Sequence, residues 1–338
     1  MAGKILLTGG LRLYRLPYLS GTHRTGLSAV VLDNLSNSSP IPLQRIEQLT
    51  GQSIPFVRGD VRDEATLDRL FNEYAIDAAI HLAGVKSVAE SVADPIAYYQ
   101  INFTGTVTLC QVMQRHGVKR FIYSSSATVY GLAAESPIRE DAPTGPASPY
   151  GQSKLMAEIA LRDIAHADPQ WTMAILRYFN PVGAHASGRI GEDPSGIPNN
   201  LMPYVSQVAT GKQPFIRVFG NDYPTADGTG VRDYLHVVDL ANAHLSALHW
   251  LDGASGAKTF NIGTGRGYSV LEIIHAYEKA CGRELPFQFL PRRDGDIASY
   301  HADPALAAEE LRWSAAHDIE DMCRDAWNWQ SQNPSGYA

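Results

Sequence analysis

The stretch Lys4-Ile5-Leu6-Leu7-Thr8-Gly9-Gly10 decides the fold of this 338-residue chain. It is a short apolar run that ends in glycines, and a second such run, AVVLD at 29–33, ends in an acid. Uninterrupted apolar runs of this length are typical of parallel strands that are buried on both faces. Glycines after the first strand and an acid after the second make up most of a dinucleotide-binding fingerprint.

Further apolar runs follow at 78–83, 120–124 and 173–177, and the stretches between them have helical patterning. Leu109, Val112, Met113 and His116, for example, are spaced to share one face of a helix. Strands that alternate with helices predict an α/β fold with a doubly wound parallel (Rossmann) sheet over roughly the first 180 residues.

The second half of the chain has a different texture. Gly, Pro and Asn crowd into 191–203 and 220–230, which we expect to be loops. Helical patterns return at 271–281 and 304–312. We therefore expect a smaller mixed domain that lies over the carboxyl ends of the strands, where ligands bind in such sheets.

Composition restricts the class of protein. Lys and Arg number 28 against 35 Asp and Glu, a net charge of −7, so a nucleic acid is not an expected partner. No run of 18 apolar residues indicates a membrane span. The three cysteines, Cys110, Cys281 and Cys323, have neither disulfide-framework nor metal-site spacing, which favours the reducing cytoplasm.

The glycine turn after the first strand is anomalous. A Gly-x-x-Gly-x-x-Gly spacing from Gly9 needs glycines at 12 and 15, where Arg12 and Arg15 stand. Residues 12–18 can be encoded by codons that read Gly-Tyr-Ile-Gly-Ser-His-Thr when the first base is dropped. This restores both glycines, so we infer that 12–29 result from a pair of compensating frameshifts.

Asp33 predicts which dinucleotide binds. An acid at the end of the second strand hydrogen-bonds an adenosine ribose hydroxyl and repels the 2′-phosphate of NADP. The expected cofactor is therefore NAD, with Gly9 and Gly10 beside its pyrophosphate.

Tyr150 and Lys154 are candidate catalytic residues. Ser148 is a predicted N-cap and Pro149 a predicted first-turn residue, so the two side chains lie one turn apart on one helix face. A tyrosine with an ordinary pKa of about 10 needs roughly 4 kcal/mol of phenolate stabilisation to act as a base near pH 7, and an ammonium group supplies the correct sign. Ser126, at the end of an upstream strand, is the expected third member.

Five long motifs carry a family resemblance. They are SSATVYG (125–131), SPYGQSK (148–154), RYFNPVGAH (177–185), GIPNNLMPY (196–204) and DGTGVRDYLHV (227–237). Together they resemble the UDP-glucose 4-epimerases, which are extended short-chain dehydrogenases/reductases, over essentially the whole chain except 12–29.

The resemblance implies roles for further residues. Tyr150 is the base, Lys154 its partner and Ser126 the third member of the group. Besides Gly9, Gly10 and these three, the implied cofactor contacts are Asp33, Asn34, Leu35, Ser36, Asn37, Ser38, Asp60, Val61, Leu82, Ala83, Gly84, Val85, Lys86, Asn102 and Phe179. The family has two consecutive asparagines here. Asn102 matches the second of them, and Ile101 stands in place of the first.

The resemblance also implies a nucleotide-sugar site. Arg232 and Arg293 would contact the diphosphate, Asp296 the uridine ribose, and Tyr300 would limit the C2 substituent of the sugar. The implied substrate contacts, with Ser126, are Asn180, Asn200, Leu201, Val218, Phe219, Arg232, Arg293, Asp296 and Tyr300.

The implied activity is the NAD-dependent interconversion of UDP-galactose and UDP-glucose by a homodimer. An NAD-binding domain at 1–180 and a UDP-sugar domain at 181–338 are expected, with part of 230–265 returning to the first. His81, His185 and His236 lack metal-site spacing, and no metal is expected.

Two alternatives stay open. If Arg12 and Arg15 are genuine, the chain is a sugar-nucleotide-binding pseudoenzyme, because arginine bulk opposes a pyrophosphate at glycine positions. The second alternative is a related sugar-nucleotide dehydratase or dehydrogenase. A 4,6-dehydratase would carry an acidic pair at the positions of Ala127 and Thr128, where this chain has no acid.

Overall fold

The computed structural model describes residues 3–11, 28–132, 135–194, 198, 200–293 and 295–337. Arg12, Arg15 and the proposed frameshifted segment up to residue 27 lie outside the described residues.

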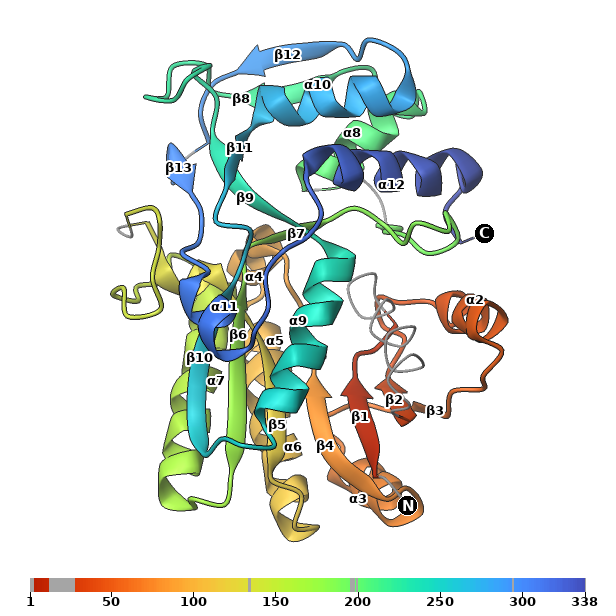
Figure 1. Cartoon of the computed structure of the whole chain (residues 1–338), viewed down its shortest axis with the longest axis vertical. Helices are drawn as coiled ribbons and strands as arrows, with labels where there is room; N and C mark the ends of the chain where they lie inside the picture. Colours follow the sequence, from red (N-terminus) through yellow and green to blue (C-terminus); the bar gives the residue numbers. More distant parts are fainter. Residues whose placement is uncertain are drawn as a thin grey trace.

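A parallel sheet forms the larger part of the molecule (Figure 1). Its strand order is β10-β6-β5-β4-β1-β2-β3, and every neighbouring pair is parallel. The strands are β1 (Lys4–Thr8), β2 (Ser28–Asp33), β3 (Phe56–Arg58), β4 (Ile76–His81), β5 (Arg120–Ser126), β6 (Thr172–Tyr178) and β10 (Gly256–Ile262). The central strands are almost wholly buried because helices cover both faces. The predicted doubly wound sheet is confirmed.

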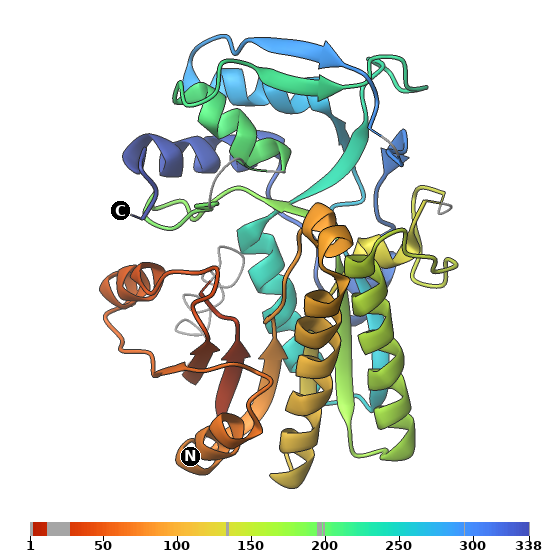
Figure 2. The same ribbon diagram turned by 180° about the vertical axis from the view of Figure 1, so that it is seen from behind.

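Helices pack on both faces of this sheet (Figures 1 and 2). One face carries α3, α6 and α7, and the other carries α9 and α11. The helices of this part are α2 (Ile41–Thr50), α3 (Glu64–Glu73), α4 (Val88–Ala93), α5 (Pro95–Tyr98), the π-helical turn η2 (Tyr99–Thr104), α6 (Gly105–Arg115), the 3-10 turn η3 (Ala127–Tyr130), α7 (Pro149–Ala167), α9 (Val237–Trp250) and α11 (Ala305–Glu310).

The second part of the molecule lies beyond the carboxyl ends of the strands (Figure 1). Its strands are β7 (Asn180–Val182), β8 (Ile216–Phe219), β9 (Val231–His236), β11 (Gly267–Ser269), β12 (Phe287–Leu290) and β13 (Ser299–Tyr300), and its helices are α8 (Leu201–Ala209), α10 (Val270–Cys281) and α12 (Ile319–Gln332). The helices α8, α10 and α12 pack together on their own apolar cluster.

Several details differ from the sequence prediction. The three-residue strand β3 lies outside the predicted apolar runs. The helix α8 begins at Leu201, inside the stretch expected to be a loop, because Met202, Tyr204 and Val205 are buried in the second apolar cluster. The helix α12 was not predicted at all. Its mean hydropathy is low, but Asp318 caps it and Met322, Cys323 and Trp329 are buried.

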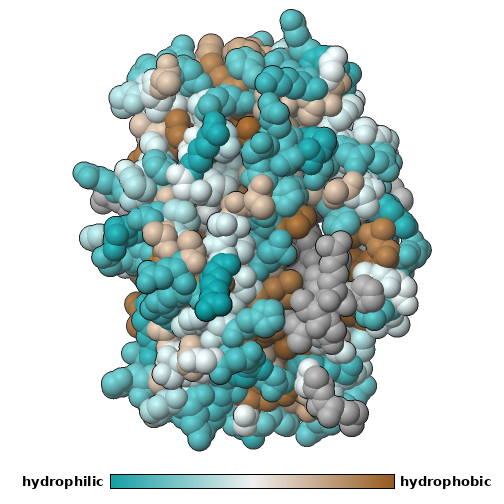
Figure 3. All heavy atoms as spheres, viewed as in Figure 1, coloured by the Kyte–Doolittle hydropathy of each residue, from teal (hydrophilic) through white to brown (hydrophobic). Residues whose placement is uncertain are grey.

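The face shown in Figure 3 is mostly hydrophilic, with hydrophobic residues in small scattered groups. Within the described residues, none of the helices is long and apolar enough to cross a membrane.

We predict that Leu7→Ala lowers the free energy of unfolding by about 2–5 kcal/mol, because Leu7 lies in a central strand with no exposed surface. Leu49→Ala is the control, since that side chain is 38% exposed. Urea unfolding followed by fluorescence measures both. Equal midpoints for the two variants would contradict the assignment of β1 to the core.

Candidate active site

The first two turns of α7 place Tyr150 and Lys154 on one side of the helix. Ser148 caps this helix by accepting a hydrogen bond from the Gly151 backbone N–H at 3.2 Å, and Pro149 occupies the first turn. The predicted start of the helix is confirmed. Side chains four residues apart on a helix are neighbours, so both groups can reach one site.

Lys154 is fixed against strand β5. Its Nζ donates to the Ser124 carbonyl at 2.7 Å and lies 4.9 Å from the centre of the Tyr123 ring. Gly84, in the loop after β4, approaches from the other side: a Cβ there would lie 3.6 Å from Lys154 Nζ and 2.8 Å from Asn102 Oδ1. A side chain at position 84 would thus crowd the lysine.

Ser126 ends β5 beside the start of α7. Its Oγ accepts from the Thr128 backbone N–H at 3.3 Å and from Thr128 Oγ1 at 3.0 Å, which caps η3. The helix α7 packs closely here, because a Cβ on Gly151 would lie 3.0 Å from the Thr128 carbonyl. The structure therefore brings Ser126, Tyr150 and Lys154 to the same end of the sheet.

Tyr98 was not predicted to belong to this region. Its ring meets that of Tyr150 edge to face, with centroids 6.4 Å apart, and it is 3% exposed. Burial and the nearby Glu90 carboxylate raise the pKa of Tyr98 to about 12, so its hydroxyl stays neutral. Because this contact joins residues 52 positions apart, no local sequence signal announces it.

The ends of β1 and β2 form the expected dinucleotide edge. Gly9 has φ of +64°, and a Cβ on Gly10 would lie 2.9 Å from Val31 Cγ1, so both positions require glycine. The buried Asp33 carboxylate accepts from the backbone N–H groups of Leu11 and Leu35 and from Ser38 Oγ. It thereby shapes the loop at 34–38.

Asp60 lies beside that loop. Its carboxylate accepts from Asn34 Nδ2 at 3.0 Å and from the Arg62 guanidinium at 2.8 Å. The hydrogen bond from Arg62 is the main reason why the pKa of Asp60 falls to about 2. Val61, the next residue, is buried against Gly105, where a Cβ would lie 2.8 Å from Val61 Cγ1.

Asn102 joins three elements at the centre of the site. It is 1% exposed and lies in the π-helical turn η2. Its Oδ1 accepts from the Val85 N–H at 2.9 Å, and its Nδ2 donates to the Val85 carbonyl and to Ser153 Oγ, each at 3.0 Å. Asn102 thus ties the loop at 82–86 to α7. Lys86, at the end of that loop, pairs with Glu192 at 3.3 Å.

The predicted substrate residues form two groups. In the first, Arg232 Nη2 lies 3.3 Å and Arg293 Nε 2.8 Å from the Asp296 carboxylate. The Arg293 guanidinium also lies 4.9 Å from the centre of the Phe219 ring. Val218 is buried on β8, and Asn200 precedes α8, where Leu201 is partly buried.

The second group consists of Tyr300 and Asn180. Tyr300, on β13, donates from Oη to the Ala127 carbonyl at 2.5 Å and packs against Phe179, with ring centres 5.7 Å apart. Asn180 donates to the Asp233 carbonyl at 2.9 Å. The two halves of the molecule therefore meet beside the serine, the tyrosine and the lysine.

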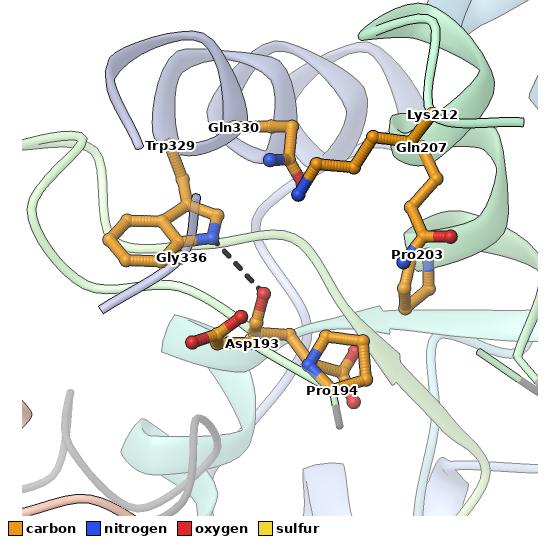
Figure 4. A pocket seen from close by; sticks show the side chains of 9 residues that line it. Asp193, Pro194, Pro203, Gln207, Lys212, Trp329, Gln330 and Gly336 are labelled. Atoms are coloured by element: carbon orange, nitrogen blue, oxygen red, sulfur yellow. Dashed lines mark hydrogen bonds between the residues drawn. The ribbon is translucent and has the colours of Figure 1, made fainter. Parts of the chain in front are cut away.

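The predicted site residues do not line the pocket of Figure 4. That pocket lies between segment 192–194, α8 and α12, where Trp329 Nε1 donates to the Glu192 carbonyl. In the described part of the chain, no group of three or more His, Cys, Asp or Glu could hold a metal ion. His81 is a buried core residue that is hydrogen-bonded to Thr8 Oγ1 and Thr106 Oγ1.

Comparisons with known proteins extend over nearly the whole chain. It is 55% identical over 333 residues to the UDP-glucose 4-epimerase of Bacillus subtilis (98% of each chain) and 51% identical over 344 residues to that of Homo sapiens (100% of this chain, 99% of the other).

Two solved structures agree. The UDP-glucose 4-epimerase of Bifidobacterium longum, in complex with NAD⁺ and UDP, superposes with a TM-score of 0.94 at 51% identity. That of Stenotrophomonas maltophila, with NAD and formylated UDP-arabinopyranose, gives 0.96 at 47% identity. Each comparison covers 98% of this chain and 99% of the other. The sequence model of the NAD dependent epimerase/dehydratase family matches residues 21–263. The chain belongs to this family, beside the UDP-glucose 4-epimerases.

Proposed function

We propose that this chain interconverts UDP-galactose and UDP-glucose, with NAD as its cofactor. The observation that carries the proposal is that Ser126, Tyr150 and Lys154 lie at the carboxyl end of β5, where Tyr300 from the second half donates to the Ala127 carbonyl. The identity of 51–55% to UDP-glucose 4-epimerases supports the same activity.

In the proposed mechanism, Tyr150 removes the proton of the sugar 4-hydroxyl while Ser126 orients that hydroxyl. The Lys154 ammonium stabilises the phenolate and is held for this by the Ser124 carbonyl. Bound NAD would serve as the acceptor of the C4 hydride and then as its donor to the opposite face. Between these steps the 4-keto sugar rotates in the site, and Tyr150 gives its proton back to the inverted oxygen.

The residues at the dinucleotide edge fit NAD. Gly9 and Gly10 leave space at the turn after β1, and Asp33 stands at the end of β2, where a ribose hydroxyl would meet an acid. We propose that residues 34–38, Asp60 and Val61 surround the adenosine. The loop at 82–86, Asn102 and Phe179 would hold the nicotinamide half, near Lys154.

The UDP part of the substrate serves as a handle. Arginine forks match phosphate oxygens, so Arg232 and Arg293 are the proposed diphosphate ligands and Asp296 the proposed uridine-ribose ligand. Asn180, Asn200, Leu201, Val218 and Phe219 complete the proposed site. The binding energy of the UDP group keeps the 4-keto sugar in the site while the sugar rotates.

The alternatives are less well supported. The relatives that match over the full length are epimerases, and no acid stands at Ala127 or Thr128 for elimination. The pseudoenzyme alternative depends on Arg12 and Arg15, which lie outside the described residues.

We also propose a cytoplasmic homodimer. The proposed domain boundary lies at residue 180, with part of 230–265 returning to the first domain, to whose sheet β10 belongs. The free thiols of Cys110, Cys281 and Cys323 support a reducing compartment. Exposed apolar side chains on helices that contact one another support a dimer interface: Val88, Val92, Ile96 and Ile159 on α4, α5 and α7. Light scattering of the purified protein tests the dimer.

We predict that the chain converts UDP-galactose to UDP-glucose and that Tyr150→Phe lowers kcat by about 10²- to 10⁴-fold, because phenylalanine cannot transfer the proton. Chromatographic separation of the two nucleotide sugars measures the reaction. Absence of turnover by the wild-type chain, together with purification free of NAD, would favour the pseudoenzyme.

We predict poor turnover of UDP-N-acetylgalactosamine, because the hydrogen bond to the Ala127 carbonyl prevents Tyr300 from moving aside. Tyr300→Ala should raise kcat/KM for this sugar relative to UDP-galactose by at least about tenfold, a change of 1.4 kcal/mol in transition-state binding. Tyr300→Phe, which keeps the ring but loses this hydrogen bond, is the comparison variant that separates the size of the ring from its fixation. An unchanged ratio in Tyr300→Ala would show that another residue limits the C2 substituent.

A further inference from the structure

Glu158 is a buried carboxylate that the proposed mechanism does not use. It has no exposed surface and lies on α7, one turn beyond Lys154 and two beyond Tyr150. Arg177, from β6, binds it with a two-point fork, Nε at 3.0 Å and Nη2 at 2.6 Å. Arg162, farther along α7, donates to the same carboxylate at 2.7 Å.

A third partner of Glu158 comes from β5. The Ser125 hydroxyl, 2% exposed, donates to Glu158 Oε1 at 2.5 Å. Ser125 lies between Ser124, whose carbonyl holds Lys154, and Ser126. The helix and the strand are therefore joined at two adjacent strand positions, once through Lys154 and once through Glu158.

The carboxylate stays ionised at this buried position. Burial raises the pKa of Glu158, but the hydrogen bonds and charge of Arg177, the Ser125 hydroxyl and the charge of Arg162 outweigh it, and the pKa lies below its ordinary value. A buried ion pair adds little net stability, because desolvation offsets the attraction. Its contribution is then the fixed geometry that fully bonded groups impose.

We propose that Ser125 and Glu158 are positioning residues that fix α7 on β5, so that Lys154 and Tyr150 face Ser126. This inference rests on the proposed function. Without the Ser125 hydroxyl, α7 keeps its ion pair to β6 and the bond from Lys154 to the Ser124 carbonyl, but it loses the second tie to β5, at Glu158. Lys154 then lies less closely against Tyr150 and stabilises its phenolate less.

The test is the ionisation of Tyr150, measured by phenolate absorbance. Each spectrum is taken against the same protein carrying Tyr150→Phe, so the other tyrosines cancel. Ser125→Ala should raise the titration midpoint by about one pH unit and lower kcat at neutral pH about tenfold, with KM unchanged. If Ser125→Ala does not fold, Ser125→Cys takes its place, because the thiol fills the same space but is only a weak hydrogen-bond donor. The same rise in the Tyr150 titration midpoint is then expected.

Ser206→Ala is the matched control. The buried Ser206 hydroxyl on α8 hydrogen-bonds the Tyr277 hydroxyl on α10 at 2.7 Å. Ser206→Ala therefore removes a comparable buried bond in the second half of the molecule, away from Tyr150. A Tyr150 midpoint in Ser125→Ala equal to that of wild type overturns the proposal, even if stability falls as in Ser206→Ala. The titration does not require turnover, so the two proposals fail separately. A wild-type chain without epimerase activity refutes the proposed function, whereas the Tyr150 titration midpoints of wild type and Ser125→Ala still decide the role of Ser125.

Discussion

The attachment of the second half of the molecule depends on one buried carboxylate, that of Asp233 on β9. It accepts hydrogen bonds from Thr264 N and Oγ1, at 2.8 and 2.7 Å, and from the backbone N–H groups of Gly265 and Ala302, at 3.0 and 3.1 Å. Burial raises the pKa of this carboxyl, and the four donors oppose that rise. Asp233 thus ties together the turn between β10 and β11 and the link from β13 to α11, both of which pass between the two halves.

This junction explains why the site is assembled from distant segments. The link that Asp233 holds at Ala302 follows Tyr300 by two residues, so fixing the link also fixes the ring over Ala127. Gly263 must be a glycine here, because a Cβ would lie 2.6 Å from Asp233 Oδ2. The proposed catalytic residues lie on β5 and α7, while the second half brings the residues proposed to select the sugar.

The sequence predicted what short-range patterns encode. The apolar runs predicted β1, β2, β4, β5 and β6 to within two residues at each end but did not predict the three-residue strand β3. Ser148 and Pro149 predicted where α7 begins. The contact of Tyr98 with Tyr150, and that of Glu158 with β5 and β6, could not be predicted, because these partners lie far away in the chain and either residue alone is ordinary in a helix. The helix α12 was not predicted, because its burial depends on packing against α8 and α10. No local sequence pattern reveals that packing.

The proposed diphosphate site carries a cluster of charged side chains that are already paired with one another. Two guanidinium groups, Arg232 and Arg293, share one carboxylate, Asp296, so the cluster keeps a net positive charge. Arg232 is held further by the Val231 and Ile297 carbonyls, whereas Arg293 is 55% exposed in its side chain and free to adjust. Fixing a guanidinium before binding reduces the entropy lost on association, although sharing Asp296 weakens its attraction for phosphate. In a site that must hold a nucleotide sugar while its 4-keto form rotates, this balance favours accurate placement of the UDP group over maximal affinity.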